Sequence, residues 1–161
     1  MHSHTPYARA IAVVTIFLAC AIGFGFLMTF LAAQVTPGLE NRDGLTRITV
    51  GSTAVYVRVA TTSAEWARGL SGTLPLPADQ GMLFEFDHDD FWHIWMKDMT
   101  YPLDILWLAD DGAIIHIAAG VAPDTYPQQF TSEQPARMVL ELPAGFVEKH
   151  GVAAGQFVTV F

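Results

Sequence analysis

Four charged side chains stand among apolar residues and are the best candidates for chemistry in this sequence. Asp104 and Glu141 each interrupt a strongly apolar run, and Arg68 and Lys97 lie at the ends of others. An isolated charge in such a place is costly unless an opposite charge or hydrogen bonds meet it. We therefore expect these two cations and two anions to converge, although 73 positions separate Arg68 from Glu141.

Such a cluster has three interpretations, which the sequence leaves open. It is a structural ion-pair network that fixes turns, or a polar pocket for a small ligand. As a third possibility it is an acid-base site, which needs two carboxylates, or one carboxylate and Lys97, with displaced pKa values around a cleft. A structure separates these cases by showing which of the groups share a concavity.

Metal binding is a weaker hypothesis, with His88, His93 and Met96 as its candidate ligands. Imidazole with thioether suits copper, and imidazole with nearby carboxylates suits zinc. On a strand, however, His93 points away from Met96, and His88 stands in an acidic turn. We therefore expect no metal and no cofactor.

Aromatic residues are dense in the middle of the chain. Trp66, Phe91, Trp92, Trp95 and Trp107 together are able to form a stacking platform for a sugar ring. Packing in the hydrophobic core is the simpler expectation for them. No nucleophile elbow, phosphate-binding glycine loop or dinucleotide fingerprint is present.

The composition of the chain narrows the range of partners that it is suited to bind. The 161 residues contain 8 Lys and Arg against 16 Asp and Glu, a net charge of -8. Proteins that bind the phosphate backbone need clustered basic side chains, so nucleic acid is excluded as a partner. With 52% hydrophobic and 15% charged residues, the chain is not disordered and part of it is suited to lipid.

Residues 10–33 form the segment suited to lipid. These 24 residues carry no charge, and as a helix they exceed a hydrocarbon core of roughly 30 Å. A cleaved signal peptide has a shorter apolar core and a clean small-residue site, which this segment lacks. We predict a single-pass anchor with residues 1–9 as a cytoplasmic tail, 34–45 as a linker and the following domain extracytoplasmic, periplasmic where an outer membrane exists.

Residues 46–161 have the pattern of one mainly β domain with short helices, built as a β-sandwich or barrel. Thr62 and Glu65 form a capping box that predicts a helix over 64–70, and Asp111-Gly112 predicts a hairpin turn. Residues 120–135 are expected to be a long loop, and 146–150 one helical turn. The expected strands are 46–50, 53–60, 81–86, 91–97, 103–109, 113–119, 136–142 and 156–161.

Several motifs in this domain resemble one known family. They are RGL at 68–70, GMLF at 81–84, WMKDMTYPLDI at 95–105, VLELPAG at 139–145 and Gly155. Their order and spacing resemble the domain of unknown function 192 family over residues 47–161. The resemblance implies a small β-sandwich-like fold, often exported or membrane-anchored, and no established activity. Asp98 stands where members often carry Asn, and we add it to the candidate polar cluster.

These observations favour a membrane-anchored binding module for a small polar or saccharide ligand. An enzyme that uses the Lys/Asp/Glu pocket is the second possibility, and a structural or interaction protein with an envelope partner is the third. A pocket that joins the charged residues favours the first two, whereas a flat apolar patch favours the third.

Overall fold

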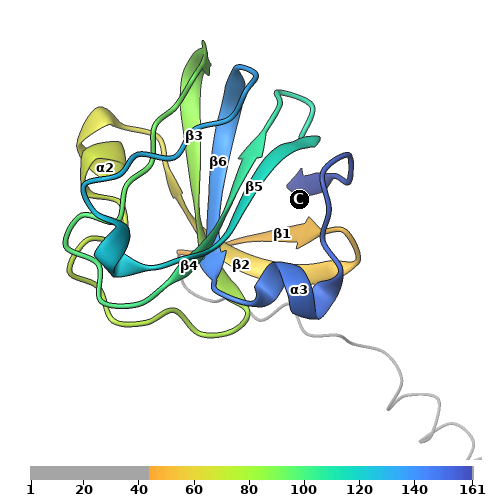
Figure 1. Ribbon diagram of the computed structural model, residues 1–161. Helices are drawn as coiled ribbons and strands as arrows, with labels where there is room; N and C mark the ends of the chain where they lie inside the picture. The colour runs from red at the N-terminus through yellow and green to blue at the C-terminus, as the bar shows by residue number, and fades with distance from the viewer. Residues whose placement is uncertain (1–43, 161) are drawn as a thin grey trace, which may run out of the picture. The chain divides into compact units, whose positions relative to one another are not determined.

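The computed structural model describes residues 44–160, which fold around one curled sheet of seven strands (Figure 1). The predicted tail, anchor and most of the linker lie outside these residues. Among residues 44–160, no helix has the length and apolar character needed to cross a bilayer. The strands are β1 Thr46–Val50, β2 Thr53–Ala60, β3 Gln80–Asp90, β4 Leu103–Leu108, β5 Ile114–Val121, β6 Ala136–Pro143 and β7 Val158–Val160.

The strand order is β5-β4-β6-β3-β2-β1-β7. Within this sheet β2 and β3 are parallel, and the other neighbouring pairs are antiparallel. A parallel pair needs a crossover, and the helix α2, Ser63–Arg68, lies in it. The remaining helices are the 3-10 turn η1, Pro123–Thr125, and α3, Phe146–His150.

The predicted capping box starts α2 as expected. The Thr62 hydroxyl accepts a hydrogen bond from the Glu65 amide at 3.3 Å, and the Glu65 carboxylate accepts one from the Thr62 amide at 3.0 Å. The Glu65 carboxylate also accepts hydrogen bonds from the Thr62 hydroxyl at 2.7 Å and from the Thr61 amide at 3.0 Å. The bond from the Thr62 hydroxyl, followed by those from the two amides, lowers the pKa of Glu65, since these bonds stabilise its charged form. The Trp66 indole donates to the carbonyl of Ala60 at 2.9 Å, which ties the helix to the end of β2.

The two edges of the sheet meet at one end, so the sheet closes into a half-barrel. Ile114 at the start of β5 donates its amide to Gln156 at 2.8 Å, and Val158 donates to Gly112 at 2.9 Å. Gly112 has a φ of +84°, and a Cβ there would lie 2.3 Å from the Val158 carbonyl oxygen, so the junction requires glycine. The domain is mainly β, as predicted, but its strands form a single sheet rather than the two of a sandwich.

Each face of the sheet carries its own apolar core. On the α2 face, Phe84, Ile105 and Val139 pack beneath α2 and the segment 91–102. On the α3 face, the residues that adjoin these along each strand point the other way and pack with Phe146 of α3. Because side chains alternate along a strand, neighbouring positions of β4 and β6 serve opposite cores.

One predicted strand is wrong and another is too short. Residues 91–97 form no strand, because Ile94 alone among them pairs with another segment as strand residues do. Its amide donates to the Phe130 carbonyl at 2.9 Å, and the Phe130 amide donates to the Ile94 carbonyl at 2.8 Å. The segment crosses over the α2 face with Ile94 and Met96 turned inward. β3 in turn runs on to Asp90 instead of ending at residue 86.

Asp104 lies on the α3 face and is fully satisfied there. Its side chain is buried, and its two carboxylate oxygens each accept a backbone N–H at 2.8 Å, one from Gly120 and one from Val147. The carboxylate therefore joins the end of β5 to the first turn of α3. Its role is structural.

Replacing Asp104 with Ala should destabilise the domain by about 2 to 4 kcal/mol, because two charge-assisted hydrogen bonds are lost and a partly buried amide is left unpaired. Asp104→Asn should cost roughly half as much, since its amide oxygen keeps one of the two bonds. Urea unfolding of the compact fragment Asn41–Phe161 measures both. Asp110→Ala removes an exposed carboxylate as the matched control. An Asp104→Ala fragment as stable as this control would contradict the assignment.

Candidate functional site

Glu141 is a buried carboxyl on the α2 face with no partner among residues 44–160. It pairs in register with Met82 of β3 and Ile105 of β4, both members of the core on that face. Its side chain is 5% exposed, and its Oε2 atom is buried without a hydrogen bond. An unpaired group of this kind is costly, so its presence in a well-packed sheet needs an explanation.

Burial raises the pKa of Glu141 from its usual value of 4.5 to about 8. Desolvation penalises the charged form, and no cation or donor offsets that penalty. The carboxyl is therefore mainly protonated at neutral pH. It is able to donate one hydrogen bond, or to release its proton to the solvent when a positively charged group lies beside it.

A small cavity of about 60 Å³, which we call the inner cavity, opens over Glu141. Its walls include Trp66 from α2, Phe84 from β3 and Trp95 from the segment 91–102, with Met99 and Leu103 beside them. His93 is the other titratable residue that lines it. The cavity thus combines three aromatic rings with one carboxyl.

A larger hollow of about 370 Å³, which we call the outer hollow, shares these aromatic walls. Phe86, Trp92 and Lys97 line it in addition. The Phe86 and Trp92 rings are stacked, with centroids 3.7 Å apart, and Trp66 packs against both. The inner cavity and the outer hollow therefore lie side by side, and we call the two together the aromatic recess, with Glu141 lining its inner part.

The tryptophans expected to pack in the core divide into two groups. Trp107 is completely buried and donates its indole N–H to the Trp92 carbonyl at 2.9 Å, so it is a core residue. Trp66 and Trp92 are partly buried in the recess, and Trp95 is 45% exposed at its rim. Phe91 is exposed as well.

Two contacts between irregular segments hold one wall of the recess. The Ser71 hydroxyl donates to the Lys97 carbonyl at 2.8 Å, and the Gly72 amide donates to the Asp98 carbonyl at 3.0 Å. Asp98 makes this contact with a left-handed backbone, φ 56°. Among non-glycine residues, Asn and Asp tolerate that conformation best, which accounts for an Asp at this position.

The structure does not bring the four predicted charges together, so their expected convergence is wrong. Arg68 is exposed at the end of α2, and Asp104 points to the opposite face of the sheet from Glu141. Lys97 is exposed, with its Nζ 5.9 Å from the centre of the Trp95 ring. Of the five candidates, Lys97 lines the outer hollow and Glu141 lines the inner cavity. A binding role for Arg68 or Asp98 stays a prediction.

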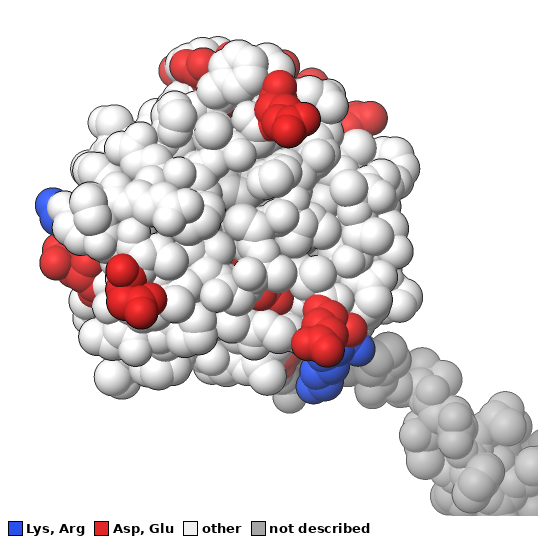
Figure 2. All heavy atoms as spheres, viewed as in Figure 1, with Lys and Arg blue, Asp and Glu red and all other residues white. Residues whose placement is uncertain are grey.

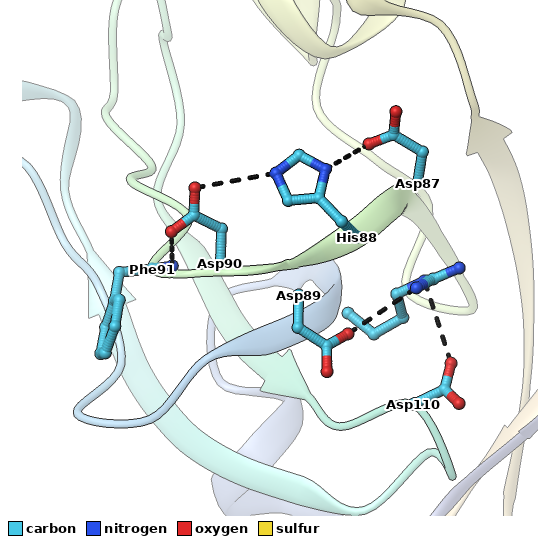
Figure 3. A network of polar contacts seen from close by, with 7 residues as sticks. Asp87, His88, Asp89, Asp90, Phe91 and Asp110 are labelled. Carbon is cyan, nitrogen blue, oxygen red and sulfur yellow. Dashed lines mark hydrogen bonds and ion pairs between the residues drawn. The ribbon is translucent and has the colours of Figure 1, made fainter.

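The three metal-ligand candidates lie apart. His88 contacts Asp87 at 2.6 Å and Asp90 at 3.8 Å in the exposed network of Figure 3, where Arg137 also approaches Asp89 and Asp110. The hydrogen bond from His88 lowers the pKa of Asp87. His93 lines the inner cavity, and Met96 is buried in the core. Within residues 44–160, no three His, Cys, Asp or Glu side chains are placed to hold a metal ion.

Comparison with known proteins assigns this domain to a family. The family model of domain of unknown function 192, described as an uncharacterized ACR, matches residues 46–160, and the chain belongs to this family. No functionally curated protein matches the chain.

Two crystal structures share the fold. One is a Sinorhizobium meliloti 1021 protein described as a proposed transcription regulator: it is 31% identical, with a TM-score of 0.67, over 72% of this chain and 92% of its own. The other, from Novosphingobium aromaticivorans, is of unknown function: it is 27% identical, with a TM-score of 0.68, over 78% of this chain and 93% of its own.

The buried carboxyl should make the stability of the domain depend on pH in an unusual direction. Folded Glu141 keeps its proton up to a pH of about 8, and the unfolded chain releases it near 4.5. Between these values the folded state binds more protons, so stability should fall as pH rises, by about 5 kcal/mol in all, and then level off. Glu65 and Asp87, whose pKa values are lowered, titrate below this window.

Urea unfolding of the fragment Asn41–Phe161 at pH 5, 6, 7, 8 and 9 measures this dependence. Glu141→Gln should give a nearly flat profile over the same range and exceed the natural protein in stability at pH 9. Parallel profiles for the two proteins would show that Glu141 does not hold a proton in the folded state.

Proposed function

We propose that this protein is a membrane-tethered module that binds a small molecule in the aromatic recess over Glu141. The observation that carries the proposal is the unpaired, buried carboxyl that lines a cavity. A domain under selection for stability alone gains by replacing such a group with an apolar one. Retaining it fits a site whose missing partner is a ligand.

The shape of the recess also supports binding. Ligand sites are concave and mainly apolar, with a few polar groups that fix orientation, and the recess has this composition. The inner cavity, of about 60 Å³, has room for one small group, and the outer hollow, of about 370 Å³, has room for a ring. We infer that the ligand places a compact polar end on Glu141 and an apolar body between the tryptophans.

The enzyme and interaction alternatives receive less support. Acid-base catalysis by paired carboxylates required Asp104 and Glu141 on one face, and they lie on opposite faces. An acid-base pair of Glu141 with Lys97 stays open, since both line the recess. An interaction protein would present a flat apolar patch, whereas the exposed aromatic Trp95 stands at the rim of a concavity.

Filling part of the inner cavity should weaken binding. In Met99→Phe a larger side chain occupies part of the cavity, and binding should weaken by at least roughly tenfold, the equivalent of about 1.4 kcal/mol. The measurement is the thermal shift of the full-length protein in mild detergent with benzyl alcohol, benzamide and phenethylamine as probes, since a ligand that binds the folded state raises its apparent stability.

Met138→Phe is the matched control, because Met138 is also partly buried but packs against the core of the α3 face. It should bind as the natural protein does. The proposal fails if none of the probes shifts the natural protein, or if both variants bind equally well.

The tethering part of the proposal concerns residues 10–33. An uncharged run of 24 residues supports a membrane span, and a short tail supports retention of the N-terminus inside. Protease added to spheroplasts should therefore digest the domain that follows residue 34. A cytoplasmic marker protein controls for intact cells, and protection of the domain in such cells would contradict the proposed topology.

A further inference from the structure

The unpaired carboxyl and the aromatic walls together define the chemistry of the missing ligand. We propose that the recess binds an organic ammonium ion, a primary amine attached to an apolar or ring-shaped body, with its ammonium group on Glu141. This inference rests on the proposed function and names its ligand class.

The first argument is charge complementarity inside the inner cavity. Glu141 is the one carboxyl among its lining residues, and no Lys or Arg lines it. A ligand carboxylate or phosphate would meet a carboxyl with no cation to balance it. An ammonium group instead supplies both the opposite charge and the hydrogen-bond donors that the Glu141 oxygens lack.

The second argument is the aromatic lining. Trp66, Phe84 and Trp95 surround the same cavity, and ring faces attract cations within about 6 Å of their centres. The protein already shows this interaction at the rim, where the Lys97 ammonium lies 5.9 Å from the centre of the Trp95 ring. A ligand ammonium in the cavity would be stabilised by the carboxyl below and the rings around it.

The third argument is the size of the inner cavity and the negative charge of the protein. A cavity of about 60 Å³ fits a primary ammonium group and excludes a bulky one, while the outer hollow accommodates the body attached to it. The chain carries a net charge of -8, and Figure 2 shows a face on which acidic side chains are more prominent than basic ones. Such a field favours the approach of a cation over an anion.

Binding of the ammonium releases a proton. The free site holds Glu141 as a neutral acid, and the ion pair requires its carboxylate, so the carboxyl O–H breaks and the proton passes to the solvent. Affinity should therefore rise with pH up to a value of about 8 and then level off. The other titratable groups that face the recess are His93 in the inner cavity and Lys97 in the outer hollow, both on the segment 91–102.

Calorimetry of the full-length protein in mild detergent tests the inference with phenethylamine and its uncharged counterpart 2-phenylethanol. We expect phenethylamine to bind at least roughly tenfold more tightly at pH 8, and its affinity to rise about tenfold per unit between pH 6 and 7. Titrations in two buffers with different ionisation enthalpies should show about one proton released per ligand at pH 6 to 7.

Variants test which side chain causes the tight binding of phenethylamine and its dependence on pH. Glu141→Gln should weaken phenethylamine binding at pH 8 by roughly tenfold to a hundredfold and remove the pH dependence below 8. Glu148→Gln makes the same change of charge at an exposed carboxylate and should bind normally. His93→Gln should keep the pH dependence, and Lys97→Gln should bind at least as tightly, since a competing cation is removed.

Other outcomes overturn the inference in distinguishable ways. If 2-phenylethanol binds as tightly as phenethylamine and Met99→Phe blocks both, the recess is a ligand site for neutral molecules and the amine inference fails alone. Loss of phenethylamine binding in Lys97→Gln with no effect of Glu141→Gln would place the ligand in the outer hollow away from Glu141 and also overturn it. If neither compound binds, the ammonium site and the proposed function fail together.

Discussion

The desolvation of one carboxyl is the constraint around which the α2 face is organised. Glu141 lies between Met82 and Ile105 on neighbouring strands, in the middle of the sheet, where no donor among residues 44–160 compensates its charge. The group is tolerated because it holds its proton and stays neutral. A neutral acid in an apolar wall is a small cost, and a charged one is a large cost. Whatever neutralises that charge in place of the proton gains the difference.

Asp104 is a second buried carboxylate in the same sheet, and it differs from Glu141 in its hydrogen-bond partners. It is one register position away from Glu141 across the β4–β6 ladder, since Asp104 pairs with Leu142 and Ile105 pairs with Glu141. It is buried as deeply, yet both of its oxygens accept backbone N–H groups. The same sheet thus satisfies one buried carboxylate completely and leaves the adjacent one without a partner. A fold that supplies donors where a carboxylate is structural indicates that their absence beside Glu141 is part of the site.

Local features of the fold were predictable because they depend on a few neighbouring residues. The capping box at Thr62, the hairpin turn at Asp111-Gly112 and most strands are of this kind. The order of strands was not predictable, because β6 enters between β4 and β3 from a distant part of the chain. The segment 91–97 alternates like a strand because one side of it covers a core, although its backbone lies outside the sheet.

The predicted convergence of charges failed for a related reason. All residues of β4 are buried, so its sequence has no polar and apolar alternation to show which way Asp104 points. Glu141 was identified as a candidate from its apolar surroundings alone, and its aromatic neighbours come from α2, β3 and the segment 91–102, which only the fold brings together.

The recess combines residues of a central strand with residues of a segment outside the sheet. Glu141 lies on a central strand bonded on both sides, so its position is fixed. Trp95 and Met99 lie on a segment whose backbone is held by the Ile94–Phe130 pair and by contacts of Lys97 and Asp98 with the turn after α2. In the proposed complex a ligand meets a carboxyl on a central strand and an aromatic wall held by few backbone hydrogen bonds. Its affinity would then depend on the charge that it brings to Glu141, and the wall would determine how large a body can follow it.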